Sequence, residues 1–297
     1  MKILLLGKNG QVGWELQRSL APLGEVIALG HAGAAGLAGD FAQPESLAAT
    51  VRAVAPGLIV NAAAHTAVDK AESEPELARL LNATTPGVVA EEAARLGAWL
   101  VHYSTDYVFD GSGTRPWVET DTPAPLSVYG ATKLEGEQRI QQSGCQHLIL
   151  RTSWVYAARG GNFAKTMLRL GQERERLTVI DDQWGAPTGA DLLADVTAHA
   201  IRHLQHRPQD GGLYHCVAAG ETTWHSYAKF VLEHASKAQQ AIKIIAKEVA
   251  PVPTSAFPTP ATRPHNSRLA TAKLQTTFGL QLPHWQTGVA RMLAEIL

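Results

Sequence analysis

Near its start the sequence reads Ile3-Leu4-Leu5-Leu6-Gly7-Lys8-Asn9-Gly10-Gln11-Val12-Gly13. The apolar run is typical of a short strand that is buried on both faces. The glycines that follow at every third position suit a tight turn into a helix over residues 12–20, where backbone N–H groups can approach a pyrophosphate. A glycine-rich turn that binds no ligand is the alternative. We predict the first unit of a Rossmann fold here, with a dinucleotide held by Gly7, Asn9, Gly10, Gln11, Val12 and Gly13.

Short apolar runs and helical patterns alternate over the first half of the chain. The predicted strands are residues 3–6, 26–29, 58–60, 99–101 and 148–150, and the predicted helices are residues 12–20, 44–54, 75–96 and 126–142. This alternation is typical of a doubly wound α/β fold, in which helices cover both faces of a parallel sheet. We predict an NAD(P)-binding Rossmann domain over residues 1–153, to which residues 176–205 return with a strand at 178–180 and a helix at 192–204. The rest of residues 154–297 is expected to form a smaller, mostly substrate-binding C-terminal domain.

A proline-rich segment spans residues 251–264 of this second part. It is either a plain linker or an ordered loop that packs over a site, because Phe257, Arg263 and Arg268 are unusual residues for a spacer. A guanidinium fork suits phosphate oxygens. Arg263 and Arg268, together with Lys165, are therefore candidate partners of a substrate diphosphate, and an ordinary surface salt bridge is the alternative for each.

The charge balance of the 297-residue chain excludes several classes of protein. Lys and Arg number 26 against 27 Asp and Glu, a formal net charge of −1 that argues against binding to nucleic acid or to an anionic membrane. The only two cysteines, Cys145 and Cys216, predict a reducing compartment. The apolar run at residues 3–6 is too short for a signal peptide or a membrane span. We therefore expect a cytoplasmic protein that binds no membrane.

The end of the second predicted strand bears on the choice of cofactor. It reads Leu29-Gly30-His31-Ala32-Gly33 and lacks the acidic residue that usually binds the adenosine ribose. Without that acid a 2′-phosphate meets less repulsion, and Lys8 and His31 can add positive charge. We predict that NADPH is preferred and that NADH is tolerated.

Three residues combine into a candidate catalytic group. Tyr129 and Lys133 are four residues apart on a predicted helix and so share one face, and Thr105 follows the fourth strand. An ammonium about 5 Å from a phenol would lower its pKa by on the order of two units. Tyr129 could then protonate an alkoxide as hydride reaches a carbonyl, while Lys133 grips the nicotinamide ribose and Thr105 hydrogen-bonds the same oxygen.

The sequence resembles the extended short-chain dehydrogenases/reductases, and among them the family of dTDP-4-dehydrorhamnose reductases. The resemblance extends over the whole chain. It rests on residues 7–13, 39–41, 60–69, 104–109, 129–133, 151–156, 162–163, 182–188 and 263–269.

The resemblance implies reduction of the C4 ketone of a dTDP-4-dehydro-6-deoxy-hexose with hydride from NADPH or NADH, in the synthesis of a cell-surface polysaccharide precursor. It places Asp40, Phe41, Ala62, Ala63 and Ala64 beside the cofactor, and Thr105, Asp106 and Trp154 at the sugar of a dTDP-sugar substrate. Members of the family also pair into homodimers through Mg²⁺. The matching acidic side chains here are Glu15 and Asp191, for which solvated surface positions are the alternative.

Two other functions remain as alternatives. A sugar-nucleotide epimerase that retains NAD would use the same Thr, Tyr and Lys, and a regulatory subunit would bind dinucleotide without chemistry. The intact Tyr129 and Lys133 argue against the regulatory subunit. Dehydratases carry an acid after the Thr-Asp pair, where this chain has Tyr107.

Overall fold

The computed structural model describes residues 1–238 and 242–297 and is built around a parallel sheet. The sheet has six strands in the order β10-β5-β4-β3-β1-β2, and every neighbouring pair in it is parallel. The strands are β1 (Lys2–Leu6), β2 (Glu25–Leu29), β3 (Leu58–Asn61), β4 (Trp99–Thr105), β5 (Gln146–Thr152) and β10 (Gly212–His215). The predicted doubly wound α/β fold is confirmed. Sequence reasoning found the first five of these strands and missed β10.

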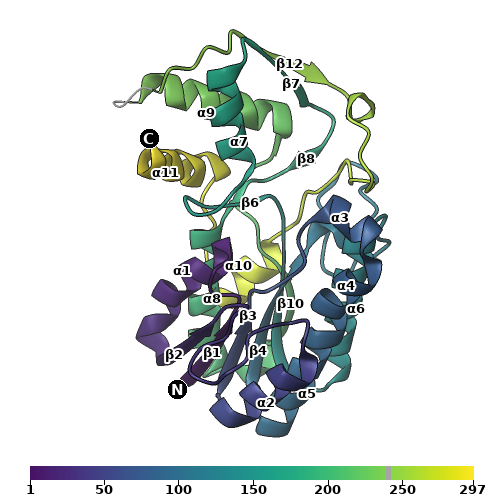
Figure 1. Ribbon diagram of the computed structural model, residues 1–297, viewed down its shortest axis with the longest axis vertical. Coiled ribbons are helices and arrows are strands. Elements are labelled where there is room, and N and C mark those ends of the chain that lie inside the picture. The colour runs from purple at the N-terminus through teal and green to yellow at the C-terminus, as the bar shows by residue number, and fades with distance from the viewer. Residues whose placement is uncertain (239–241) are drawn as a thin grey trace.

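Helices cover both faces of the sheet, as Figure 1 shows. Helices α1 (Gln11–Leu20) and α8 (Ala190–Leu204) pack together on one face, and α2 (Pro44–Val54), α5 (Thr85–Leu96) and α6 (Val128–Gln142) lie on the other. Successive residues of a strand point to opposite faces. Ile3 and Leu5 of β1 accordingly join the core beneath α1 and α8, while Leu4 and Leu6 join the core beneath α2 and α5.

The C-terminal part forms a smaller layer beyond the carboxyl ends of the strands (Figure 1). Its helices α7 (Phe163–Glu173), α9 (Trp224–Lys237) and α11 (Trp285–Ile296) share a third core. The short helix α10 (Ala272–Phe278) instead packs beside β10 and α8. Three two-stranded sheets complete this part: β7 (Arg176–Ile180) with β12 (Glu248–Val252), β8 (Trp184–Gly185) with β11 (Thr222–Thr223), and β6 (Val155–Tyr156) with β9 (Thr188–Gly189).

One local prediction was wrong. The strand at 178–180 does not return to the main sheet: as part of β7 it pairs with β12. Its side chains alternate between buried and exposed, as expected for a strand covered on one face only, whereas strands inside the main sheet are buried on both. The helix predicted over residues 75–96 is present and uninterrupted, but it runs as α4 (Pro75–Arg79), a π-helical turn (Leu80–Thr84) and α5. Pro86 lies just after the π-helical turn, and a proline inside a regular α-helix would clash with the carbonyl four residues earlier.

The proline-rich segment is an ordered loop rather than a linker. The backbone N–H of Ala261 donates to Asp69, which follows the first residue of the short helix α3 (Val68–Ser73). Arg263 binds both carboxylate oxygens of the same aspartate, at 3.0 and 2.7 Å. Within the two ranges described, none of the helices combines the length and the apolar character needed to cross a membrane.

Candidate active site

The glycine loop lies between β1 and α1, beside the start of the next crossover. Gly7 has a φ of +87°, and a Cβ at this position would lie 2.6 Å from the backbone nitrogen of Ala63. A Cβ on Gly13 would lie 2.0 Å from the carbonyl oxygen of Gly7. Glycine is therefore required at both positions for the backbone to pack this closely. Gly10 precedes α1, and in the part of the chain described here no side chain caps that helix, so its first N–H groups can receive a diphosphate.

The other residues predicted for the loop lie around this turn. The side chain of Asn9 lies against Gly30, since a Cβ on Gly30 would be 2.5 Å from the Asn9 amide nitrogen. Gln11 accepts a hydrogen bond from Asn162 at 3.3 Å, which links α1 to the start of α7. Val12 packs on the core beneath α1. The residues that we predicted as cofactor contacts thus line one turn at the carboxyl end of β1, inside the sheet.

An acidic side chain does lie near the end of β2, but it comes from the following loop. Asp40 is 3.1 Å from the Nδ1 of His31. The end of β2 itself carries no acid, as predicted, and the carboxylate comes from Asp40, which the resemblance had placed beside the cofactor. Asp40 restores part of the repulsion toward a 2′-phosphate, and His31 opposes it when protonated.

The next residues predicted beside the cofactor border the two central strands. Ala62, Ala63 and Ala64 follow β3, and the N–H of Ala62 donates to the Leu6 carbonyl of β1. Phe41 is buried, and its carbonyl accepts the hydroxyl of Thr85. Chain connections leave β1 and β3 in opposite directions along the sheet, and ligands of α/β proteins bind in the crevice at such a switch point.

Thr105, Tyr129 and Lys133 are brought together at the carboxyl end of β4. Thr105 ends the strand, and Tyr129 and Lys133 lie in the first turns of α6. The Thr105 hydroxyl donates to Asp106 at 3.0 Å, and its proximity acts to lower the pKa of Tyr129. A Ser127 side chain that accepts from the N–H of Gly130 caps the helix.

The electrostatics of this group differ from the prediction. Burial raises the pKa of Tyr129 to about 12 rather than lowering it. The Lys133 nitrogen is directed to the Tyr103 carbonyl at 2.6 Å and to His102 at 3.1 Å, and burial lowers its pKa to about 8. Desolvation therefore outweighs the attraction that we expected from the ammonium. Tyr129 is fully protonated near neutral pH, which is the form that a proton donor needs.

Asp106 is buried directly beside the Thr105–Tyr129 pair. Burial raises the pKa of its carboxyl to about 6, and its hydrogen bond with Thr105 acts in the opposite direction. The resemblance assigns Asp106 to the sugar. A carboxyl group that is held in an unfavourable environment next to the proposed proton donor is typical of a functional site.

We expect the Asp106→Asn variant to be more stable than the wild type at about pH 8 and nearly equal to it at about pH 4. The folded carboxyl has its pKa at about 6 and the ordinary value is 3.8, so the unfolded chain ionises first and stability falls as the pH rises from about 4 through 6. Asparagine does not ionise and removes this loss. Thermal unfolding followed by circular dichroism at both pH values measures the difference. An identical pH dependence in the two proteins would contradict the prediction.

A cavity of about 290 Å³ lies next to Tyr107, whose ring meets that of Tyr129 edge-on at 5.5 Å. Its wall is mainly aromatic and apolar, and it includes Phe163, Trp224, Phe257 and Arg263. Sequence reasoning assigned no site role to Phe163 or Trp224, because each belongs to an apolar helix stripe. Phe257 and Arg263 belong to the proline-rich loop.

Trp154 lies beside this cavity through its contact with Trp224. The two rings are stacked with centroids 3.6 Å apart. Trp154 has a φ of +49°, a conformation that is unusual for a residue other than glycine and that is often found at functional sites. A Cβ on Gly185 would be 2.7 Å from the Trp154 ring, so this glycine makes room for the indole.

The three basic residues predicted for a diphosphate are not gathered at one point. Arg263 lines the cavity while it binds Asp69. Arg268 lies over the ring of Trp184 and forms an ion pair with Glu221 at 2.5 Å. Lys165 donates to the carbonyls of residues 158 and 160. Arg263 is thus the basic candidate that the structure places at the cavity wall.

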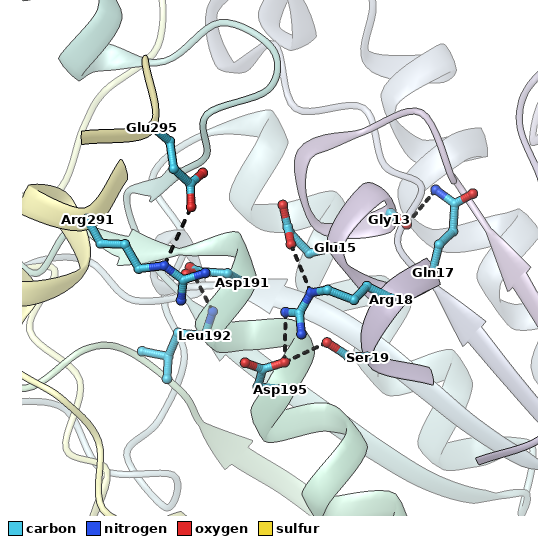
Figure 2. A network of polar contacts seen from close by, with 10 residues as sticks. All are labelled: Gly13, Glu15, Gln17, Arg18, Ser19, Asp191, Leu192, Asp195, Arg291 and Glu295. Atoms are coloured by element: carbon cyan, nitrogen blue, oxygen red, sulfur yellow. Dashed lines mark hydrogen bonds and ion pairs between the residues drawn. The ribbon is translucent and has the colours of Figure 1, made fainter. Parts of the chain in front are cut away.

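Glu15 and Asp191 belong to a network of charged side chains between α1, α8 and α11 (Figure 2). Glu15 lies 3.7 Å from Arg18, and Asp191 lies 3.4 Å from Arg291. Arg291 also contacts Glu295 at 3.5 Å. Over residues 1–238 and 242–297 no group of three or more metal-ligating side chains is placed to hold an ion. Carboxylates are suitable Mg²⁺ ligands, but here arginines compete for them, so these residues do not fit a metal site within one chain.

A Rossmann sheet that carries a glycine loop at its switch point and a Thr–Tyr–Lys group at the end of its fourth strand defines an extended short-chain dehydrogenase/reductase. A family model supports a narrower assignment. The chain belongs to the family described as the RmlD substrate binding domain, whose model matches residues 1–297.

Similar proteins agree with this family. The chain is 61% identical to the dTDP-4-dehydrorhamnose reductase of Escherichia coli (strain K12), over 100% of this chain and 98% of that protein. It is 45% identical to the enzyme of the same name from Burkholderia thailandensis, over 100% and 99%. The solved dTDP-4-dehydrorhamnose reductase of Clostridium acetobutylicum superposes with a TM-score of 0.89 at 34% identity, over 100% of this chain and 99% of that one. The Bacillus anthracis enzyme in complex with NADP gives 0.87 at 34% identity, over 99% of both chains.

Proposed function

We propose that this protein reduces the C4 ketone of dTDP-4-dehydro-6-deoxy-L-mannose to dTDP-L-rhamnose, the last step in the synthesis of that cell-surface polysaccharide precursor. The main support for the proposal is that Thr105, Tyr129 and Lys133 lie at the carboxyl ends of the sheet strands, where the glycine loop also lies. Full-length identity of 61% to a dTDP-4-dehydrorhamnose reductase supports the substrate class.

The glycine loop and the alanines after β3 fit a dinucleotide. A Cβ on Gly7 or Gly13 would clash with neighbouring backbone, so only glycine allows the tight turn whose N–H groups can face a diphosphate. NADPH or NADH, when bound, supplies the hydride. Tyr129 donates its phenolic proton to the ketone oxygen, and Thr105 hydrogen-bonds the same oxygen. Lys133 would hold the nicotinamide ribose. Thr105 and Lys133 are buried, whereas Tyr129 is partly exposed, as a side chain that meets the substrate must be.

The smaller C-terminal layer is proposed to bind the nucleotide part of the substrate. We assign residues 1–153 with α8 and β10 to the cofactor domain, and most of the remainder to the substrate domain. The aromatic cavity walled by Phe163, Trp224 and Phe257 suits a planar base, with Arg263 available to the diphosphate and Trp154 to the sugar. Arg263 would then exchange its contact with Asp69 for phosphate oxygens.

We further propose that the protein acts in the cytoplasm, that it pairs as a homodimer, and that it binds no nucleic acid. The near-zero net charge supports the last point, and the two buried free cysteines of the described chain support a reducing compartment. Positive charge is needed only where anionic cofactor and substrate bind.

The decisive test is oxidation of NADPH in the presence of dTDP-4-dehydro-6-deoxy-L-mannose. We expect the absorbance of NADPH to fall in proportion to dTDP-L-rhamnose formed, and much less turnover with the matching UDP-sugar ketones. Absence of turnover with the dTDP ketone would contradict the substrate assignment. A purified protein that retains NAD⁺ and isomerises sugar nucleotides without consuming NADPH would identify an epimerase instead.

We expect kcat/KM to be higher with NADPH than with NADH, with NADH still used. The end of β2 carries Gly30 in place of an acid, and His31 can pair with Asp40 and reduce its repulsion of a 2′-phosphate. Steady-state kinetics with both cofactors measure the ratio. A tenfold or greater preference for NADH would show that Asp40 dominates at this position.

A further inference from the structure

A buried histidine lies directly behind the catalytic lysine. His102 is in the middle of β4 and is only 1% exposed. One ring nitrogen, Nδ1, is 3.0 Å from the side-chain nitrogen of Asn61 on β3, and the other, Nε2, is 3.1 Å from the nitrogen of Lys133 on α6. His102 follows the apolar residues 99–101 and is the first polar residue of β4, which is the sequence signal for this feature.

The hydrogen bonds of Asn61 determine which nitrogen of His102 carries the proton. The Oδ1 of Asn61 accepts the backbone N–H of Ala63 at 3.0 Å. Its amide nitrogen therefore faces His102 and donates to Nδ1, which must be unprotonated. In a neutral imidazole the proton is then on Nε2. Burial and the nearby Lys133 lower the pKa of His102 well below its usual value, so the ring is neutral.

The Nε2–H of His102 consequently points at the Lys133 nitrogen. An ammonium has three N–H donors and no lone pair, so it cannot accept this hydrogen bond. A neutral amine can accept it and still donate to the Tyr103 carbonyl at 2.6 Å. The arrangement thus favours the amine form of Lys133 relative to a site without the histidine.

The other charged groups around Lys133 leave this effect largely unopposed. Glu137, one turn further along α6, attracts the ammonium form. Its two carboxylate oxygens are engaged by Arg151 of β5 at 2.9 and 2.6 Å, however, and this buried ion pair is neutral overall. Tyr129, on the same helix, is protonated and uncharged near neutral pH.

We propose that His102 is a positioning residue for Lys133: Asn61 holds it with its N–H toward the lysine nitrogen, so that Lys133 exchanges readily between ammonium and amine during turnover. This inference rests on the proposed reductase function. After Tyr129 has given its proton to the substrate oxygen, the Lys133 ammonium replaces that proton and becomes an amine. The amine accepts the His102 N–H and regains a proton from water once the product has left.

The pH profile of kcat tests the proposal through His102→Gln. The wild type should lose activity near pH 8 as Lys133 loses its proton. Glutamine can turn an oxygen toward the ammonium, which would raise the pKa of Lys133 and move the alkaline limb up by about one pH unit. A uniform loss of kcat with no shift of the limb would overturn the proposal. His215→Gln is the matched control, because His215 is a fully buried histidine on β10 whose ring nitrogen contacts the Trp117 carbonyl.

Asn61→Asp provides a second test that does not depend on folding of the glutamine variant. A carboxylate would still accept the Ala63 N–H, and it would also accept a proton from Nδ1, which reverses the tautomer of His102. Nε2 would then offer a lone pair to the Lys133 ammonium. The alkaline limb should again move to higher pH, and a limb that stays in place or moves to lower pH would contradict the proposal.

A spectroscopic test needs no substrate. The ¹⁵N chemical shifts of His102 in the uncomplexed protein should show a protonated Nε2 and an unprotonated Nδ1, with the ring neutral at pH 7. The opposite tautomer would overturn the inference even if the enzyme is active. Absence of turnover together with the expected tautomer would instead contradict the reductase function and leave the Asn61–His102–Lys133 arrangement intact.

Discussion

The Tyr129→Phe variant is expected to lose at least a hundredfold in kcat while it binds NADPH nearly as well as the wild type. The phenolic hydroxyl is the group that we expect to protonate the ketone oxygen, and removal of a general acid typically costs a factor of about 10² to 10⁴. The ring itself is kept, so its edge-on contact with Tyr107 and the packing of α6 should persist. Steady-state kinetics and fluorescence titration with NADPH measure the two quantities separately.

Tyr214→Phe is a suitable control for this experiment. Tyr214 lies on the edge strand β10, and its hydroxyl donates to the Asp210 carbonyl, away from the carboxyl end of β4. Its loss should leave kcat within about twofold, because no proposed step uses it. Near-normal turnover of the Tyr129→Phe variant would exclude Tyr129 as the proton donor.

The second large effect concerns stability. We expect Arg151→Leu to lower the free energy of unfolding by about 3–5 kcal/mol. Arg151 and Glu137 are 4% and 2% exposed and form two hydrogen bonds, and removal of the arginine leaves an unpaired carboxylate in the core between β5 and α6. The guanidinium also lies over the ring of Phe109 at 5.0 Å. Denaturation in urea, with protein concentration and pH held fixed, measures the change.

Two further variants separate burial from charge. Arg169→Leu breaks the exposed pair with Glu173 on α7 and should cost no more than about 1 kcal/mol. The double variant Arg151→Leu/Glu137→Leu removes both buried charges and should regain much of the stability lost by the single variant. A single variant as stable as the wild type would mean that the buried carboxylate finds other partners.

Much of the fold could be predicted because it depends on local patterns. Each central strand is a short apolar run, and such runs are buried wherever helices cover both faces of a sheet. The strand β10 escaped prediction because it has only four residues, Gly212–His215, and pairs only with β5 at the edge. The strand β7 was found, but its partner was not, since pairing depends on which apolar surfaces meet in space.

The candidate site likewise has features that local sequence patterns predict and features that depend on packing in space. The i, i+4 spacing of Tyr129 and Lys133 and the position of Thr105 after a strand were readable along the chain. The direction of the Lys133 nitrogen was not, and the predicted lowering of the Tyr129 pKa failed because desolvation depends on everything packed around the ring. The contact between Asp40 and His31 was missed because it depends on how the loop after β2 folds back, with Gly39 against the Gly30 carbonyl.

The sequence by itself determined the doubly wound architecture, the glycine turn and the choice of candidate reacting side chains, because each follows from spacing within one or two elements. Only the tertiary structure decided how those side chains are charged and aimed. It buries Lys133 against His102, commits Arg263 to Asp69, and pairs Glu15 and Asp191 with arginines. Protonation and ion pairing depend on distances and on exclusion of water, and both are set when segments far apart in the chain pack against each other.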